Sequence, residues 1–216
     1  MDAARSGTRR SALVCLCLVL ALLFACVQNA PVGTHDVKIL PAEEKVALLQ
    51  RLYDRQYAAL DSLLLGYQAQ FEKDLDYEYV LWDAWDAFRV SDMKLSRLLT
   101  EWVDSSAGSP VAYLALGQHY MALAYQARSA ARRSGTAEES REDMLRYAAA
   151  AAEAARKALG TNRRLITAYA VLIEVAGLHG DAALSERYLR SALKISPYCF
   201  VIRAAHMSNL SPRLSG

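Results

Sequence analysis

The chain has 216 residues, of which 54% are hydrophobic and 22% are charged, which is enough for one domain with a sizeable core. Ten glycines and five prolines exclude collagen-like and proline-rich disordered chains, and a formal net charge of +2 gives no reason to expect a nucleic-acid partner. Two of the four cysteines lie in an apolar N-terminal stretch, which excludes a disulfide scaffold.

The N-terminus has the pattern of an export signal. Three arginines among the first ten residues precede an unbroken apolar run at residues 13–25, which is too short for a membrane-spanning helix of about 20 residues. The run ends in Leu23-Phe24-Ala25-Cys26, which resembles a bacterial lipobox. This resemblance implies cleavage before Cys26 and a diacylglyceryl group on its thiol, so that the membrane is contacted through a lipid anchor.

The residue that follows Cys26 indicates the membrane to which a bacterial lipoprotein is sorted. Val27, rather than an aspartate, follows Cys26, which by the usual bacterial sorting rule implies the periplasmic face of the outer membrane. The alternatives are a secreted or periplasmic protein with an ordinary signal peptide, and an uncleaved anchor. Residues 1–25 are therefore predicted as a signal peptide, and residues 26–41, with Pro31 and Gly33, as the lipidated cysteine and a flexible tether.

Helical periodicity dominates from Pro41 onward. Four helices are expected between residues 42 and 108: one opening with acidic residues after Pro41, one around residues 57–71, one at about 78–90 and one at about 94–103. The second carries an apolar face at steps of three or four residues, made by Tyr57, Leu60, Leu64, Tyr67 and Phe71. Alternating β patterns of five or more residues are absent, so the sequence predicts an all-α domain.

The second half opens after a break at residues 105–110. Ser109 is a suitable N-cap. Pro110 suits the first helical position, because the backbone N–H that proline lacks would have no hydrogen-bond partner within the helix there. Residues 128–143 are polar and show no apolar face, which predicts a loop with helical ends. Within it, residues 136–139 match a capping box where a helix can restart, and an alanine-rich helix is expected at about 144–159.

Two units of this half resemble the tetratricopeptide repeat. The first reproduces the spacing of the first repeat helix with Tyr113, Leu116, Gly117 and Tyr120, and about 22 extra residues separate it from its second helix. The second unit has Tyr169, Leu172, a turn at Gly180-Asp181, and closing residues Ala192, Leu193 and Pro197. The resemblance implies antiparallel helix pairs stacked as a short solenoid of about eight helices.

The repeat-like part spans residues 109–216, with the insertion at 128–143, and residues 42–108 are repeat-like in architecture only. An irregular helical bundle is the alternative. Residues 48–216 are also similar to an uncharacterised bacterial domain family. Four short segments carry this similarity: residues 57–61, 102–103, 116–120 and 210–213. That similarity implies a fold and a general binding role rather than a reaction.

No residue pattern points to catalysis, a metal or a cofactor. Asp74, Asp76 and Glu78 alternate but lack the glycine of a calcium loop, and they are interpreted as a solvated helix junction. His119 is interpreted as a partly buried hydrogen-bonding residue rather than a catalytic base, and Cys199 as a buried free thiol. A phosphate loop, a nucleophile elbow and paired-cysteine motifs are all missing, so a non-catalytic protein is expected.

The expected function is binding of a protein or peptide partner on a concave helical surface. The candidate contact residues are Tyr113, Gln118, Tyr120, Tyr169, Arg132 and Arg133. Residues 26–110 hold 14 acidic and 8 basic side chains (net −6), whereas residues 111–216 hold 8 acidic and 14 basic side chains (net +6). We interpret this asymmetry as two halves of the domain that attract each other, and the alternative is a binding surface of one charge sign in each half.

A glycan or small-ligand receptor is the alternative function. Trp82 and Trp85 lie three residues apart on a predicted helix, so their directions differ by roughly 60°. Packing of both in the core is favoured, and an exposed aromatic surface that stacks on sugar rings is the alternative.

Overall fold

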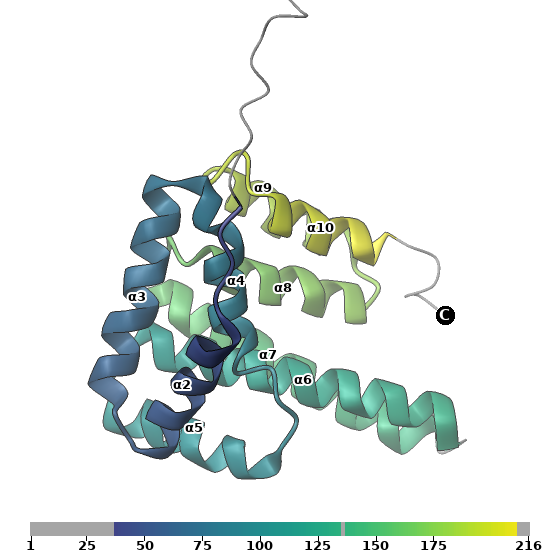
Figure 1. Cartoon of the computed structure of the whole chain (residues 1–216). Coiled ribbons are helices and arrows are strands. Elements are labelled where there is room, and N and C mark those ends of the chain that lie inside the picture. Colours follow the sequence, from purple (N-terminus) through teal and green to yellow (C-terminus); the bar gives the residue numbers. More distant parts are fainter. Residues whose placement is uncertain (1–36, 135–136, 211–216) are drawn as a thin grey trace, which may run out of the picture. The chain divides into compact units, whose positions relative to one another are not determined.

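The computed structural model describes residues 37–134 and 137–210, with the side chains of residues 131–137 left out. The predicted signal peptide, Cys26 and most of the predicted tether lie outside these residues. Within them every regular element is helical, which confirms the all-α prediction (Figure 1). The elements are α2 (Ala42–Tyr53), α3 (Tyr57–Lys73), the short 3-10 helix η1 (Leu75–Tyr77), α4 (Glu78–Asp86), α5 (Met93–Ser105), α6 (Pro110–Ser134), α7 (Ala137–Thr161), α8 (Ile166–Leu178), α9 (Ala182–Leu193) and α10 (Phe200–Asn209).

Helix starts follow the capping chemistry of the sequence. The Ser109 hydroxyl accepts a hydrogen bond from the Ala112 backbone N–H at 3.2 Å, so α6 begins at the expected residue. The Asp181 carboxylate accepts from the Leu184 N–H at 2.8 Å and opens α9 directly after Gly180. Gly180 has φ +70°, a conformation that glycine adopts without strain, and the predicted inter-helix turn is confirmed.

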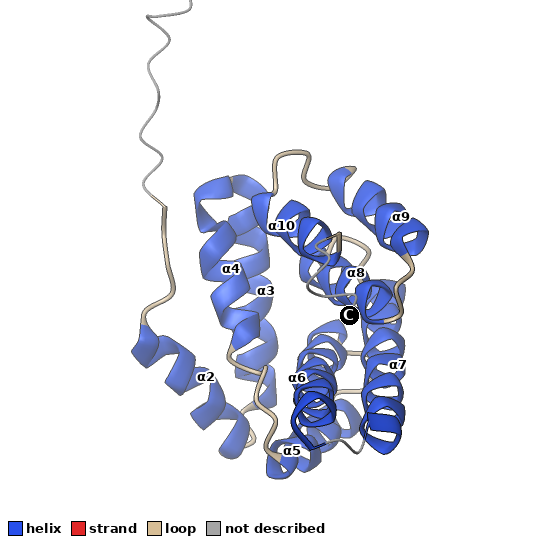
Figure 2. Cartoon of the chain, turned by 90° about the vertical axis from the view of Figure 1, so that its right-hand side faces the viewer, coloured by secondary structure: helices blue, strands red, loops and turns tan. Residues whose placement is uncertain are grey.

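The helices form three layers, which Figure 2 shows end-on. Helices α6, α8 and α10 make the middle layer. Helices α7 and α9 lie on one side of it, and α3 and α4 lie on the other. The pairs α6–α7 and α8–α9 are antiparallel hairpins, while α2 and α5 pack beside α3 and α6.

Aromatic side chains of α3, α4, α5 and the turn after α4 meet in the core. Trp85 and Trp102 have no exposed surface, and Phe88 lies between them, with a centroid distance of 6.0 Å to Trp102. Tyr57 stacks on Trp102 at 6.0 Å with an interplanar angle of 8°. These rings bind α3, α4 and α5 together, since buried aromatics dominate the apolar area removed from water.

The α6–α7 hairpin depends on small residues along its seam. A Cβ atom at Gly117 would stand 3.4 Å from the Ala151 carbonyl oxygen and 3.6 Å from the Ala154 Cβ, which are ordinary van der Waals contacts, so the seam has room for an alanine there but not for a large side chain.

The polar stretch at residues 128–143 is helical along most of its length, contrary to the expected loop. Helix α6 continues to Ser134 and α7 begins at Ala137, so the insertion lengthens both helices of the hairpin. Alanine, arginine and glutamate dominate the stretch and are strong helix formers, so the two helices continue without an apolar face of their own. Thr136, which opens the proposed capping box, lies outside the described residues.

The last residues of the predicted tether also differ from expectation, because they are held against the domain. The Lys38 ammonium pairs with Asp74 at 3.0 Å and lies 4.0 Å from the Tyr77 ring centroid, and its backbone N–H donates to the Asp76 carbonyl. Leu40 is buried in the core. Fixed structure therefore begins before Pro41.

Candidate functional site

Helix α4 lies across the middle layer and contacts both of its ends. At its start, Glu78 accepts hydrogen bonds from the Val201 backbone N–H at 2.5 Å and from the Cys199 thiol at 3.1 Å, at the beginning of α10. Just past its end, Arg89 reaches Glu174 of α8. The part of the middle layer beside α4 is thereby covered, and the part beyond its C-terminus stays open.

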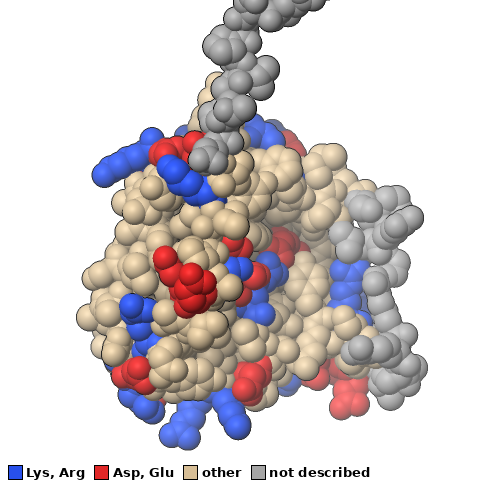
Figure 3. All heavy atoms as spheres, viewed as in Figure 1, with Lys and Arg blue, Asp and Glu red and all other residues tan. Residues whose placement is uncertain are grey.

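This open part is a groove of about 400 Å³, which we call the Arg89 groove. Figure 3 shows that acidic and basic side chains lie side by side near the middle of one face of the molecule. The residues that line the groove come from the end of α4, the turn after it, and one face of α6. They are Asp86, Arg89, Ser91, Ala122, Tyr125, Gln126 and Ser129.

A buried ion pair forms the floor of the Arg89 groove. The Arg89 Nη1 and Nη2 atoms donate to the two carboxylate oxygens of Glu174 at 3.1 and 2.6 Å, and the Tyr125 hydroxyl donates to Oε2 at 3.1 Å. The Arg89 guanidinium carbon also lies 5.7 Å from the Tyr125 ring centroid. The side chains of Arg89 and Glu174 are only 17% and 9% exposed, so the pair is largely shielded from water.

The electrostatics keep this floor charged but balanced. Burial opposes the charge on Arg89, yet the neighbouring Glu174 carboxylate outweighs burial and raises the pKa of the guanidinium. Burial and the same carboxylate raise the pKa of the Tyr125 phenol, which stays protonated. Asp86, which also lines the groove, lies 3.7 Å from the Lys45 ammonium, and that ammonium lies 2.7 Å from Asp83. The groove is therefore lined by one carboxylate and one guanidinium, each with an oppositely charged neighbour.

The groove offers hydrogen-bonding groups of both kinds. A guanidinium carries five N–H donors, and the two contacts to Glu174 use two of them. The Tyr125 oxygen can accept, and the side chains of Ser91, Gln126 and Ser129 can both donate and accept. Such a surface suits a neutral ligand with alternating donors and acceptors, as in an extended peptide backbone.

The tyrosines predicted to contact a partner lie elsewhere on α6. At 100° per residue, Tyr113 and Tyr120 point roughly opposite to Ala122 and Tyr125, which line the groove. Tyr120 stacks on Tyr147 of α7 at 6.4 Å, and the Lys157 ammonium lies 5.5 Å from the Tyr113 ring centroid. The structure therefore places this pair on the α6–α7 seam.

The remaining predicted contact residues are not brought together in one surface. Gln118 is 1% exposed, so its prediction as a contact residue is wrong: the side chain is enclosed by the core. Tyr169 is half-buried and donates to the Arg163 carbonyl oxygen at 3.4 Å. Arg132 and Arg133 lie in α6, but their side chains are outside the described residues.

The alternative aromatic surface does not form. Trp85 is fully buried, so its prediction as half of a sugar-stacking pair is wrong, and core packing is confirmed for it. Trp82 is half-buried and packs against the core. Their 60° separation turns one ring into the core and leaves the other at its edge.

Several polar residues singled out in the sequence have structural contacts. The Asp74 carboxylate accepts from the Asp76 N–H at 3.0 Å and pairs with Lys38. The sequence suggested that Glu78 belongs to a solvated helix junction. For this residue the interpretation is wrong, because its side chain is buried and only 7% exposed. Cys199 is a buried free thiol, as predicted, and burial raises its pKa to about 12.

Sequence reasoning missed the Arg89 groove, although one signal was present. Glu174 is the only charged residue of α8, whose other residues are almost all apolar. A helix that is apolar all round is a buried helix, and a lone carboxylate in it needs a buried cation. Arg89 was not identifiable as that cation, because 85 residues separate the two positions.

No family model, curated protein or solved structure matches the chain. Among the residues that the structure describes, no helix combines the length and the hydropathy needed to span a bilayer.

Proposed function

We propose that the protein binds an extended segment of a partner protein in the Arg89 groove. The observation that carries this proposal is the groove itself: an open volume of about 400 Å³ over a fixed ion pair, with donors and acceptors at its surface. Binding sites are concave and are largely formed before the ligand arrives. The bidentate Arg89–Glu174 contact supplies such a preformed floor.

The arrangement of the helices supports the same proposal. We interpret α6–α7 and α8–α9 as tetratricopeptide-like pairs and α10 as the first helix of a further unit. On that interpretation α6, α8 and α10 line the concave side of a short solenoid, which is the side that suits extended partners. Helix α4 fills one part of this side, and the Arg89 groove is the part left for a ligand.

The chemistry of the groove favours a neutral polar segment over a strongly charged one. Lys45 with Asp83 and Asp86, and Arg89 with Glu174, make two cations and three carboxylates, which leaves an excess of only one negative charge. A peptide backbone satisfies the remaining donors and acceptors, whereas an apolar ligand would leave them without partners.

We further propose that the domain works at a membrane surface, anchored through Cys26. The lipobox-like sequence supports this location, and several acyl chains on one cysteine give stable anchoring. The partner is then a protein of the bacterial cell envelope, met on the periplasmic face of the outer membrane.

The experiment is site-specific photo-crosslinking in intact bacteria that express the full chain. A photoreactive amino acid replaces Gln126, which is exposed and lines the groove. In a matched control it replaces Arg187, which is exposed on α9 in the outer layer. We expect one cross-linked envelope protein from position 126, identified by mass spectrometry, and none of that protein from position 187.

A second variant tests the floor of the groove. Tyr125→Phe keeps the ring and removes the hydroxyl, whose oxygen is available to accept a hydrogen bond from the bound segment while its proton goes to Glu174. Loss of one such bond to the segment, worth about 0.5–1.5 kcal/mol, should lower the cross-linking yield at position 126 by roughly two- to tenfold. Equal cross-linking from positions 126 and 187, or a yield that Tyr125→Phe leaves unchanged, contradicts binding in the groove.

A further inference from the structure

The starts of three helices gather around the end of α3 at one end of the domain. Residues of α3, α4, α8 and the start of α10 line a small cavity there, among them Phe71, Glu78 and Ile202. Figures 1 and 2 show the loop from α9 to α10 at this same end. The first described residues are held there too, since the Lys38 backbone N–H donates to the Asp76 carbonyl oxygen of η1. We call this the entry end, because the chain enters the domain here.

The entry end exposes large apolar side chains to solvent. Val37 is 54% exposed, and Leu75 of η1 is 38% exposed. At the start of α10, Tyr198 and Phe200 flank the buried Cys199 and are 80% and 57% exposed. Tyr198 is the most exposed large apolar side chain among the described residues. Exposed apolar side chains that gather at one end of a domain indicate a surface for interaction.

Several charges at the entry end are paired with each other. The Lys38 ammonium contacts Asp74 at 3.0 Å, and the Arg164 guanidinium contacts Glu72 at 2.9 Å beside the end of α3. Arg203 of α10 donates at 3.0 Å to the backbone carbonyl that precedes its helix. Exposed aromatic rings beside basic side chains are typical of the boundary between a bilayer and water, where the rings lie among the headgroups.

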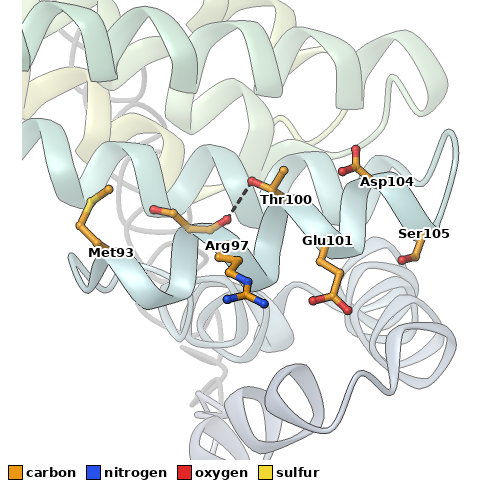
Figure 4. Close-up of a pocket in the computed structure, with 7 residues that line it drawn as sticks. Met93, Arg97, Thr100, Glu101, Asp104 and Ser105 are labelled. Atoms are coloured by element: carbon orange, nitrogen blue, oxygen red, sulfur yellow. Dashed lines mark hydrogen bonds between the residues drawn. The ribbon is translucent and has the colours of Figure 1, made fainter.

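The opposite end of α3 carries a different surface. The 17 residues of α3 separate the two ends by about 25 Å. There the outer face of α5 carries mostly polar and charged side chains, which include Arg97 and Glu101 in Figure 4. Arg55, just before α3, pairs with Glu101 at 2.5 Å. Behind this face His119 of α6 is fully buried and hydrogen-bonded to a serine of α5, so this histidine belongs to the core.

We propose that the entry end rests on the surface of a phospholipid bilayer, with Tyr198 and Phe200 among the headgroups. This inference rests on the proposed lipid anchor at Cys26. Val37 follows Cys26 by 11 positions, a length of chain that spans at most about 40 Å when fully extended. A surface tethered so closely meets the bilayer at a high effective concentration, so a modest apolar contact is enough to hold it there.

The paired charges also bear on the kind of lipid. Lys38 with Asp74, and Arg164 with Glu72, cancel in pairs, so the contact does not require an anionic headgroup. Docking at the entry end turns the outer face of α5 and the start of α3 away from the bilayer.

The test uses the mature chain, purified with its lipid from bacterial membranes and reconstituted in phosphatidylcholine vesicles. The acyl chains carry bromine near the headgroups, because bromine quenches tryptophan fluorescence on contact. Tyr198→Trp places a reporter at the entry end. Tyr53→Trp is the matched control, since Tyr53 is 47% exposed at the end of α2, next to the start of α3. Relative to the wild-type chain, we expect the added emission to be quenched for Tyr198→Trp and not for Tyr53→Trp.

A second substitution tests the apolar contact itself. Burial of a large apolar side chain shifts a partition equilibrium by roughly ten- to hundredfold, so Phe200→Ser in the Tyr198→Trp chain should lower the ratio of docked to free domains by about tenfold. Met207→Ser is the control, because it removes a side chain that is 62% exposed near the other end of α10. It should leave the quenching unchanged, and equal effects of the two substitutions contradict docking through Phe200.

The mass of the purified chain separates this inference from the proposed anchor. If Cys26 carries the lipid but both reporters are quenched equally, or neither is quenched, docking is wrong and the anchor stands. If Cys26 carries no lipid, the anchor is wrong, and the comparison is repeated at high vesicle concentration. Stronger quenching of Tyr198→Trp then still supports docking, and equal quenching overturns it. A blue shift of the Tyr198→Trp emission with rising protein concentration and no lipid shows that a second copy covers the surface, which also overturns the proposal.

Discussion

The Arg89–Glu174 pair is the most informative point at which to perturb the fold. Arg89→Met removes the cation and leaves the Glu174 carboxylate, whose side chain is 9% exposed, without its partner. It also ends both hydrogen bonds between the two side chains. Removing one member of a buried pair costs about 3–5 kcal/mol, because the remaining charge is left uncompensated.

The loss is measured by urea unfolding and by heat. For a domain of this size each kcal/mol lowers Tm by roughly 2–4 °C, so Arg89→Met should lower Tm by on the order of 10 °C. The double variant with Arg89→Met and Glu174→Gln is the control. It removes both charges while keeping an acceptor for the Tyr125 hydroxyl, so it should recover most of the lost stability.

The two variants together test the electrostatic reasoning. If burial of an unpaired charge is the cause, the single variant must be much less stable than the double variant. A single variant within about 0.5 kcal/mol of the wild type, or a double variant no more stable than the single one, would refute the argument that this pair is effectively buried.

Three further predictions follow from features of the described chain. Gly117→Leu forces a large side chain toward Ala151 and Ala154 and should cost about 1–3 kcal/mol in urea unfolding, whereas Gly66→Ala, with open space around its Cβ, should gain up to about 1 kcal/mol from helix propensity. Burial raises the pKa of Cys199 from 9.0 to about 12, so above pH 9 the unfolded state loses the thiol proton while the folded state keeps it. Stability should therefore fall between pH 9 and 12, and by less in Cys199→Ala; equal slopes for the two proteins would show that the thiol does not contribute. Cys26→Ala should move the full chain from the membrane fraction to the soluble fraction, and an unchanged distribution would count against the lipid anchor.

The helices were predictable because each carries a local signal. The apolar face from Tyr57 to Phe71 gives α3, and Ser109 with Pro110 gives the start of α6. The third helix was expected to reach Val90 but ends at Asp86. The chain turns after Asp86, and this turn brings the Arg89 side chain into hydrogen-bond contact with Glu174. Turns held by distant side chains leave no mark on the neighbouring sequence.

The candidate sites were harder to predict for the same reason. The repeat-like residues of α6 were found by spacing, but spacing does not say which face of a helix stays open. Tyr113 and Tyr120 are half-buried against α7, while Tyr125, which follows no motif, lines the Arg89 groove. The hydrogen bond between the side chains of Ser96 and His119 could not be predicted either, because the two residues are 23 positions apart on different helices and only the crossing of α5 and α6 joins them.

The contacts of α4 bear on how the chain folds as it is made. In a stack whose units touch only their neighbours, each unit can form as soon as it emerges. Here Glu78 is bound by groups 121 and 123 residues further along the chain, at Cys199 and Val201. We therefore expect the N-terminal helices to stay incompletely packed until α10 has been synthesised, and on the proposed export this delay would keep the chain unfolded for passage across the membrane.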